Sequence, residues 1–299
     1  MAKQKYKEIR FQNKTLQLID LINDVAKEYQ EKGYVLTLRQ MYYQLVARGY
    51  IENSQRSYKN VGKTISDGRT AGLIDWDVII DRLRGIRGRD HEESPVYALA
   101  ELSESYSLNK WRGQPNYVEV WVEKDALIDV VGRACNAIDT PYTSDRGYTS
   151  TTEIRNAAQR FINHSDKEGR YIIYLGDHDP SGVDMTRDIK DRLELFGANV
   201  EVRRIALTME QIRTYNPPPA FAKTGDARTP KYIKEHGLEA WELDALDPEV
   251  LHDLIQSEVE SLIDVPLYNA FFDQEQEERE ELLSIARNYS EVQRLLKQA

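Results

Sequence analysis

Strand-like and helix-like segments alternate from residue 113 to residue 205, and this alternation constrains the fold more than any other feature. Three segments have the pattern of β-strands: 117–122, 171–175 and 199–205. Three segments have the pattern of helices: 125–137, 153–162 and 182–195. Such alternation is typical of a mostly parallel sheet covered by helices. We therefore expect an α/β fold whose end, beyond the proline-rich segment 216–219, is largely helical. We also expect the acidic stretch 273–281 to begin a last helix.

The first 80 residues predict a different arrangement, made of helices. Three helices are expected, over residues 10–32, 38–48 and 57–71. Thr37 is expected to cap the second helix and Gly49 to end it. Residues 73–80 predict a short pair of strands. Three helices and a small hairpin are typical of a winged helix-turn-helix domain of the CAP-like type.

Glycine and proline residues concentrate between residues 85 and 116, around one helical stretch at 96–108. We place the domain boundary in this region. The predicted N-terminal domain covers residues 1–112, with a linker from about residue 85, and the second domain covers residues 113–299. A length of 299 residues agrees with two domains of roughly 150 residues each.

The net charge of −10 is unevenly distributed between these two parts. Residues 1–112 carry 19 Lys and Arg against 15 Asp and Glu, a balance of +4, while residues 113–299 carry 21 against 35, a balance of −14. The asymmetry favours a first domain that binds an anionic polymer and a second domain that is rich in carboxylates. Solubility alone is the other explanation for such a difference.

Composition excludes several classes of protein. The chain is 40% hydrophobic and 30% charged, so it can bury a core and is not intrinsically disordered. It has no apolar run of the roughly 18–20 residues that cross a membrane, and its charged start is unlike a secretory signal. Cys135 is the only cysteine, which excludes an internal disulfide. We expect a soluble cytoplasmic protein.

Three carboxylates follow two of the predicted strands. Glu123 comes directly after segment 117–122, and Asp177 and Asp179 follow segment 171–175 after one glycine. Residues just past the carboxyl ends of parallel strands converge on one crevice, and carboxylate oxygens are hard ligands suited to Mg²⁺. We therefore predict a magnesium site here. The alternative is that the two aspartates form an ordinary turn and helix cap.

The third predicted helix and its flank are basic. They contain Arg56, Lys59, Lys63 and Arg69 against a single acid, Asp67. The first three are spaced three or four residues apart and share a helix face. This spacing favours a helix that contacts DNA phosphates, although a solvated surface has the same appearance.

Two segments resemble the Toprim domain of the topoisomerase VI A-subunit family, which includes the meiotic proteins that make double-strand breaks. They are Val-Trp-Val-Glu-Lys-Asp-Ala-Leu at 120–127 and Gly-Asp-His-Asp-Pro-Ser-Gly at 176–182. Members of that family join a winged-helix domain to a Toprim domain in this order. Segments 111–114, 222–228 and 241–246 are most similar to the standalone Mini-A branch of bacteria, plasmids and phages. One departure is Gly-Tyr-Thr at 147–149, where the family has Gly-Tyr-Pro.

The resemblance also identifies a candidate nucleophile. Arg39-Gln-Met-Tyr42-Tyr43 matches the family motif Arg-x-x-Tyr-Tyr, whose second tyrosine attacks DNA. Helical spacing places Tyr42 within the apolar stripe of its helix and Tyr43 off the edge, on the same face as Arg39. A neighbouring guanidinium favours the phenolate and can grip a phosphate. The alternative is that both tyrosines only pack.

The resemblance implies Mg²⁺-dependent cleavage of double-stranded DNA through a 5′-phosphotyrosyl intermediate. It implies Tyr43 and Arg39 as catalytic residues, Mg²⁺ on the three carboxylates, and Lys124 as a candidate phosphate contact. It also implies a homodimer, a nucleoid-associated location, and either a separate ATPase subunit or none. Two alternatives stay open: a hydrolytic Toprim nuclease, and a noncatalytic module that binds DNA or recruits a partner. No role is assigned to Lys223, Asp226 and Arg228.

Overall fold

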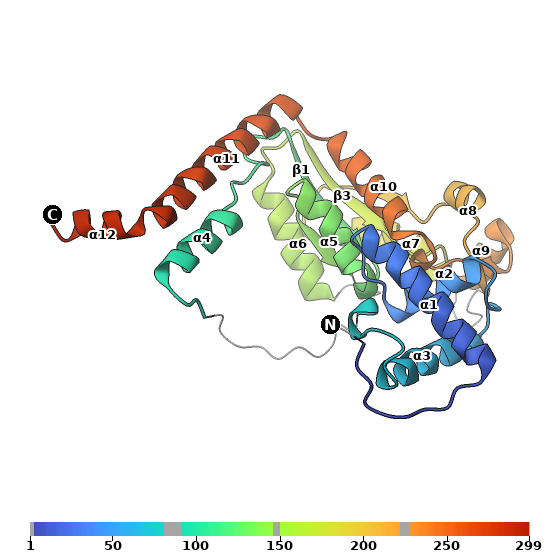
Figure 1. Ribbon diagram of the computed structural model, residues 1–299. Helices are drawn as coiled ribbons and strands as arrows, with labels where there is room; N and C mark the ends of the chain where they lie inside the picture. The colour runs from blue at the N-terminus through green and yellow to red at the C-terminus, as the bar shows by residue number, and fades with distance from the viewer. Residues whose placement is uncertain (1–2, 81–90, 146–149, 222–227, 299) are drawn as a thin grey trace.

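The computed structural model describes residues 3–80, 91–145, 150–221 and 228–298, and within them the protein is an α/β fold (Figure 1). The sheet has four strands in these residues: β1 (Asn116–Val122), β2 (Tyr142–Ser144), β3 (Gly169–Leu175) and β4 (Glu201–Ala206). Their order is β2-β1-β3-β4, and every neighbouring pair is parallel. The prediction of a mostly parallel sheet is therefore confirmed. Strand β2 was not predicted, because three residues are too short to show a pattern.

Helices cover both faces of the sheet. On one face lie α6 (Thr151–Asn163) and α7 (Pro180–Leu195), which pack on Trp121, Ile172 and Tyr174. On the other face lie α5 (Ile128–Ala137), which follows the short 3-10 helix η2 (Asp125–Leu127), and α10 (Pro248–Glu260). Because both faces are buried, the central strands are mostly apolar, as parallel strands generally are, and the buried Glu119 of β1 is paired with Arg160.

The three predicted N-terminal helices are confirmed as α1 (Asn13–Glu31), α2 (Leu38–Ala47) and α3 (Gln55–Thr70). Thr37 caps α2 in a capping box with Gln40. Helix α3 begins two residues earlier than expected, because Ser54 accepts a hydrogen bond from the Ser57 amide at 3.1 Å. Gly49 follows α2 with a φ of 71°, a conformation that favours glycine.

The predicted strand pair over residues 73–80 is wrong. The segment forms a 3-10 helix, η1 (Trp76–Val78), and a single parallel bridge between Leu36 and Ile79. Arg69 Nη2 donates to two backbone carbonyl oxygens of the segment, each at 2.6 Å. These hydrogen bonds satisfy carbonyl groups that a partner strand would otherwise bind. The winged-helix assignment therefore stays a prediction.

The N-terminal helices pack directly on the sheet domain. One apolar core continues from α1 and α2 into α5 and α10, so the two predicted domains share it. Polar contacts border this core: the Tyr29 hydroxyl donates to Asp247, Lys32 Nζ lies 2.9 Å from Glu249 Oε2, and Arg133 Nη1 donates to the Lys32 carbonyl at 2.9 Å. The shared core fixes α2 relative to the ends of the strands.

The chain beyond β4 returns to the sheet edge through short elements. These are α8 (Met209–Tyr215), the antiparallel pair of β5 (Ala220–Phe221) and β6 (Glu239–Ala240), α9 (Thr229–His236) and the 3-10 helix η3 (Leu243–Ala245). Trp241 pairs with His178 through two backbone hydrogen bonds of 2.8 and 3.0 Å. This bridge places η3 beside the segment that follows β3.

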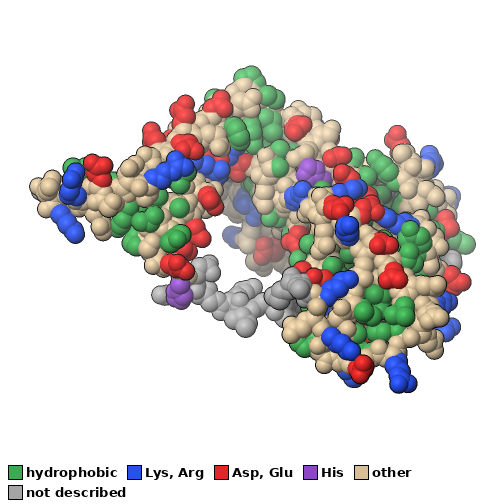
Figure 2. Space-filling view, viewed as in Figure 1, with side chains coloured by type: hydrophobic (Ala, Val, Ile, Leu, Met, Phe, Trp, Pro, Cys, Tyr) green, Lys and Arg blue, Asp and Glu red, His purple; other side chains and the backbone are tan. Residues whose placement is uncertain are grey.

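Helices α4 (Pro95–Ser105), α11 (Val265–Arg287) and α12 (Tyr289–Leu296) form an arm that projects from the sheet (Figure 1). Apolar side chains are exposed along this arm (Figure 2). We expected the acidic stretch 273–281 to begin a helix, and this prediction is wrong. The stretch lies within α11, whose N-terminus is capped by Asp264. Glu275 is buried there with Lys110, whose Nζ is 2.5 Å from its carboxylate.

The buried pair of Lys110 and Glu275 holds the arm to the body. We expect Lys110→Ala to lower the free energy of unfolding by about 2 kcal/mol, because the buried carboxylate loses its buried ion pair and keeps the ion pair with Arg279 and the hydrogen bond from the Leu108 amide. Urea unfolding measures this change. Lys190→Ala is the control, since its pair with Glu194 is exposed at 3.9 Å and should contribute less than about 0.5 kcal/mol. Equal losses of unfolding free energy in both variants would show that the pair of Lys110 and Glu275 does not stabilise the arm.

Candidate functional site

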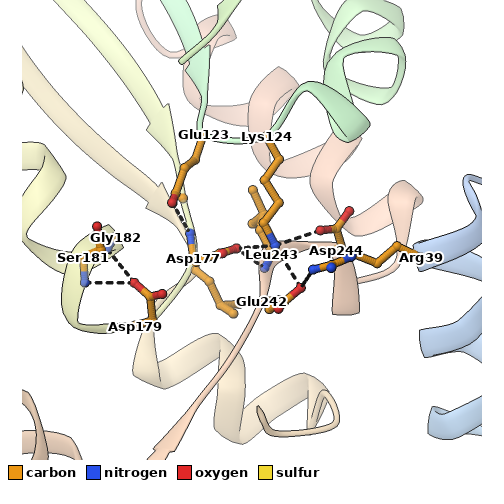
Figure 3. Close-up of polar contacts among 12 residues, drawn as sticks. Arg39, Glu123, Lys124, Asp177, Asp179, Ser181, Gly182, Glu242, Leu243 and Asp244 are labelled. Carbon is orange, nitrogen blue, oxygen red and sulfur yellow. Dashed lines mark hydrogen bonds and ion pairs between the residues drawn. The ribbon is translucent and has the colours of Figure 1, made fainter. Parts of the chain in front are cut away.

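The carboxyl ends of β1 and β3 bring two of the predicted site residues together. Val122 pairs with Leu175 across these strands, so the residues that follow them are neighbours. Glu123 Oε2 accepts a hydrogen bond from the Asp177 backbone amide at 2.8 Å (Figure 3). The structure thus places these two residues together at one edge of the sheet, as predicted.

Asp177 is held by the protein from two sides. Its side chain is buried, and its Oδ1 accepts a hydrogen bond from the Leu243 amide at 2.8 Å and lies 2.9 Å from Lys124 Nζ. Burial raises the pKa of Asp177, although Lys124 opposes the shift. Burial and the nearby charge of Asp177 also raise the pKa of Glu123, to about 7. The raised pKa values show that the negative charges of Glu123 and Asp177 are poorly solvated at this edge of the sheet.

Asp179 has a different role in the described arrangement. Its Oδ1 accepts hydrogen bonds from the backbone amides of Ser181 at 2.9 Å and Gly182 at 2.7 Å, so it caps α7 (Figure 3). For this aspartate, the helix-cap alternative describes the observed contacts. The turn also requires glycine, because a Cβ at Gly182 would lie 2.2 Å from the Asp177 carbonyl oxygen.

The three predicted metal ligands do not surround one point. Among the residues that the structure describes, no group of three or more His, Cys, Asp or Glu side chains is arranged to hold an ion. The donors suit Mg²⁺ chemically, but protein amides and the Lys124 ammonium already bind them. The observed arrangement does not fit a magnesium ion, and the magnesium site stays a prediction.

Lys124 is the cation that contacts carboxylates of several segments at this edge of the sheet. Its Nζ lies 2.9 Å from Asp177 Oδ1, 2.8 Å from Asp244 Oδ2 and 3.1 Å from Glu242 Oε2 (Figure 3). These carboxylates raise the pKa of Lys124, although burial acts in the opposite direction. Asp244 is fully buried, and its Oδ1 has no hydrogen-bond partner within the described part of the chain. One ammonium group thus contacts three carboxylates.

Sequence reasoning did not assign roles to Glu242 and Asp244. Both lie in the Trp-Glu-Leu-Asp-Ala-Leu segment at 241–246, which the sequence connects to function only through the family resemblance. The alternation of two acids with apolar residues was a weak signal, because it also suits a solvated strand. The bridge between Trp241 and His178 and the Leu243 amide that binds Asp177 show that this segment reaches the sheet edge, and neither contact can be seen in the sequence.

Helix α2 adds the two predicted catalytic residues to this cluster. Arg39 donates to Glu242 Oε2, and Tyr43 lies beside the same carboxylate. Tyr43 is only 6% exposed, and η3 packs against α2, the helix that carries it. Burial and the charge of Glu242 raise the pKa of Tyr43, and Arg39 opposes this only in part. Arg39 thus favours the phenolate, as expected, but burial and Glu242 outweigh it, so the net pKa shift keeps the phenol protonated.

Tyr42 is part of the core, as predicted. It is buried, and its hydroxyl donates to Asn53 Oδ1 at 2.8 Å. Its ring also packs edge-on against Tyr58, at 5.3 Å between ring centroids. The two tyrosine rings also pack on each other, with centroids 5.2 Å apart, but their hydroxyls differ in partner: that of Tyr42 binds Asn53, and that of Tyr43 lies beside Glu242.

The predicted DNA-binding residues divide into two groups. Arg56, Lys59 and Lys63 are exposed on α3, where Lys63 forms an ion pair with Asp67. Arg69 instead hydrogen bonds to backbone carbonyls at η1, and its guanidinium lies 5.6 Å from the centre of the Trp76 ring. The first three remain candidates for phosphate contacts, while the contacts of Arg69 are structural.

A groove of about 940 Å³ lies between α3 and the start of the sheet domain. Its lining includes Arg39, Tyr58 and Arg69 from the helical part and Asp125 from η2. The groove therefore leads from the surface beside α3 to the guanidinium that contacts Glu242.

Some predicted features lie outside the described residues. These are Gly147, Tyr148 and Thr149, and also Lys223 and Asp226. Arg228 is described, and its Nη1 lies 3.2 Å from Asp184 Oδ2 on α7.

In comparisons with protein-family models and with curated proteins, the chain matches none. The resemblance to the topoisomerase VI A-subunit family therefore rests on its motifs.

The raised pKa of Glu123 makes a prediction about stability and pH. A carboxyl whose folded pKa is raised stabilises the fold at low pH, and this contribution is lost as the pH rises through about 7. Glu123→Gln keeps a hydrogen-bond acceptor and removes this loss. Between pH 5 and pH 8 the variant should gain roughly 1–3 kcal/mol relative to wild type, measured by urea unfolding. Glu194→Gln, on the exposed side of α7, should show no such gain.

The magnesium prediction is tested in the same experiment. If Mg²⁺ binds at Glu123, adding millimolar Mg²⁺ at pH 8 should raise the stability of wild type, because bound ligand favours the folded state. The Glu123→Gln variant should respond much less. An equal response of both proteins, or no response of wild type, would contradict magnesium binding at Glu123.

Proposed function

We propose that this protein cleaves double-stranded DNA by tyrosine transesterification, in the manner of the topoisomerase VI A-subunit family. The observation that supports this best is the meeting of α2 and the sheet edge at one cluster. Tyr43 and Arg39 of α2 contact Glu242, which in turn contacts Lys124 after β1. A phenol thus lies beside two cationic side chains that suit a phosphate group.

The proposed reaction uses the chain's own groups as follows. The Tyr43 Oη attacks a DNA phosphorus atom, so that an oxygen–phosphorus bond forms and the bond to the 3′ oxygen breaks. The phenol loses its proton, and the released 3′ oxygen gains one. Arg39 and Lys124 would bind the non-bridging phosphate oxygens and stabilise the charge that develops in the transition state. The product is a 5′-phosphotyrosyl bond and a free 3′ hydroxyl.

Magnesium dependence is part of the proposal because hard oxygen donors lie at the sheet edge. We derive no step through the ion, since Glu123, Asp177 and Asp179 do not form an ion site in the described arrangement.

The proposed substrate is duplex DNA, bound by the exposed face of α3 that carries Arg56, Lys59 and Lys63. Breaking both strands would use one Tyr43 from each of two copies, which is why we propose a homodimer. A separate ATPase subunit, or none, would complete the assembly, and the proposed location is the cytoplasm with the nucleoid. Among the described helices, none combines the length and the apolar character of a membrane span.

A hydrolytic nuclease is the second candidate function. The burial of Tyr43 favours it, because a tyrosine that is 6% exposed and has a raised pKa is well suited to packing. In that case water would attack the phosphate, and no covalent complex would form. A noncatalytic DNA-binding or recruiting module would produce no cleavage.

The nature of the cut ends separates these functions. Wild type incubated with supercoiled plasmid and Mg²⁺, then quenched with detergent, should yield breaks whose 5′ ends carry protein. Tyr43→Phe removes one oxygen and should abolish these covalent complexes. Tyr42→Phe, the matched control, should keep them and lose only about 1 kcal/mol of stability with its hydrogen bond to Asn53. Arg39→Ala should reduce attachment by roughly tenfold or more.

Two results would contradict the proposal. Free 5′-phosphate ends that form equally with Tyr43→Phe would favour the hydrolytic nuclease. Attachment that is lost with Tyr42→Phe but retained with Tyr43→Phe would show that Tyr42, and not Tyr43, is the nucleophile.

Binding to DNA should depend steeply on salt. The slope of log K against log[salt] should be about −0.9 per phosphate neutralised, and replacing Lys59 and Lys63 with alanine should flatten it by about one to two units. Fluorescence anisotropy with a labelled duplex measures this slope in the full chain. Lys27→Ala, an exposed lysine of α1, should leave the slope unchanged. If Lys27→Ala flattens the slope as much, α3 is not the binding surface.

A further inference from the structure

Glu242 occupies the space between the two cations of the site. Its Oε2 accepts hydrogen bonds from Arg39 on α2 and from Lys124 after β1, the latter at 3.1 Å (Figure 3). The same carboxylate lies beside the Tyr43 hydroxyl. Arg39, Lys124 and Tyr43 are the three groups that a reacting phosphate would have to contact. A single protein carboxylate therefore holds the place of that phosphate.

We propose that Glu242 is a displaceable substitute for the DNA phosphate. In the free protein it closes the site, and when DNA binds, a backbone phosphate takes its place between Arg39 and Lys124. This inference rests on the proposed function, and it adds the regulation of that site: Tyr43 becomes competent only when substrate displaces Glu242.

Glu242 is better suited to leave than the other two carboxylates on Lys124. Asp177 is also fixed by the Leu243 amide at 2.8 Å, and Asp244 is fully buried. The Glu242 side chain is 27% exposed, and the hydrogen bonds that the described residues give its carboxylate come from side chains. It can therefore rotate into solvent without breaking a backbone contact.

A phosphate has the chemistry to compete for this place. It offers two non-bridging oxygens in a geometry that matches the guanidinium fork of Arg39, whereas Glu242 contacts that guanidinium through one oxygen. Arg39 is 43% exposed and lines the groove beside α3, so an entering phosphate can reach it from the surface. Displacement would then exchange one anion for another and keep both cations compensated.

The charges around Tyr43 keep its phenol unreactive while Glu242 occupies the site. The charge of Glu242 adds to burial in raising the pKa of Tyr43, which keeps the phenol protonated. Glu242 is also poorly suited to act as a general base. Although burial opposes the shift, Lys124 and Arg39 hold the pKa of Glu242 below its usual value. Removing the carboxylate should therefore activate the site.

Binding of a short labelled DNA duplex tests this inference without relying on cleavage. The experiment compares Tyr43→Phe with Tyr43→Phe/Glu242→Gln, so no covalent product forms. The added Glu242→Gln change should tighten binding by about tenfold, because it frees Arg39 and Lys124 for phosphate. Glu249→Gln is the matched control, since it removes the same charge from an ion pair with Lys32 of 2.9 Å that involves neither Arg39 nor Lys124, and it should leave affinity unchanged. Unchanged or weaker binding with Glu242→Gln would overturn the inference.

A measurement on the wild-type protein keeps the inference testable if Glu242→Gln folds poorly. The Tyr43 side-chain resonance is observed with ¹³Cζ-labelled tyrosine and assigned by its loss in Tyr43→Phe. Adding the duplex should shift this resonance, because a phosphate takes the place of the carboxylate that lies beside the Tyr43 hydroxyl. A Tyr43 resonance that stays unchanged at saturating DNA would overturn the inference.

Attachment and binding distinguish the two proposals. With Tyr43 intact, Glu242→Gln should increase covalent attachment, whereas loss of attachment would show that the carboxylate is required and would overturn the inference. If wild type forms no covalent complex but Glu242→Gln still tightens DNA binding, the transesterase proposal fails and displacement of Glu242 is supported.

Discussion

The contacts of the Lys124 ammonium with three carboxylates determine how the site is assembled. Buried charges are stable only when they are paired, and Asp177 and Asp244 would repel each other at this sheet edge without a cation between them. Lys124 occupies that position because it directly follows Glu123 at the end of β1. The ammonium therefore joins the segments after β1 and β3 to η3. Since η3 packs on α2, the same charge cluster also sets where Tyr43 lies.

The contact between the helical part and the sheet domain has two chemically different regions. Around α1, α5 and α10 it is an apolar core bordered by contacts such as that of Lys32 with Glu249. Around α2 and η3 the described contacts that bear on function are charged, and they centre on Glu242. Dissolved or bound anions compete with ionic contacts but leave apolar burial intact. One region therefore suits permanent attachment, and the other suits exchange with a phosphate.

The parts of the fold that could be predicted are those set by local pattern. The strands β1, β3 and β4, the helices of the first 80 residues and the convergence of Glu123 with Asp177 all follow from short-range periodicity and from the geometry of parallel strands. The roles of Glu242 and Asp244 could not be predicted, because they depend on contacts between distant segments, such as the bridge between Trp241 and His178. The expected strand pair at 73–80 failed for a related reason, since Arg69 binds its carbonyl groups from another element. Likewise, the periodicity of α2 shows that Tyr43 leaves the apolar stripe, but not that the folded protein buries it.

The burial of Tyr43 restricts how any transesterase of this form can work. An attacking oxygen must come within roughly 3–3.5 Å of phosphorus, but Tyr43 is only 6% exposed and Glu242 lies beside its hydroxyl while the contact stays closed. Opening of the whole interface would expose the apolar core around Tyr29 and Ile22, at a cost of roughly 1.5–3 kcal/mol for each large side chain. Opening only at the ionic contacts of Arg39 and Lys124 costs far less, because phosphate oxygens replace the carboxylate oxygens that are lost. The least costly route to a reactive Tyr43 is therefore local, and the substrate itself supplies the anion that this route needs.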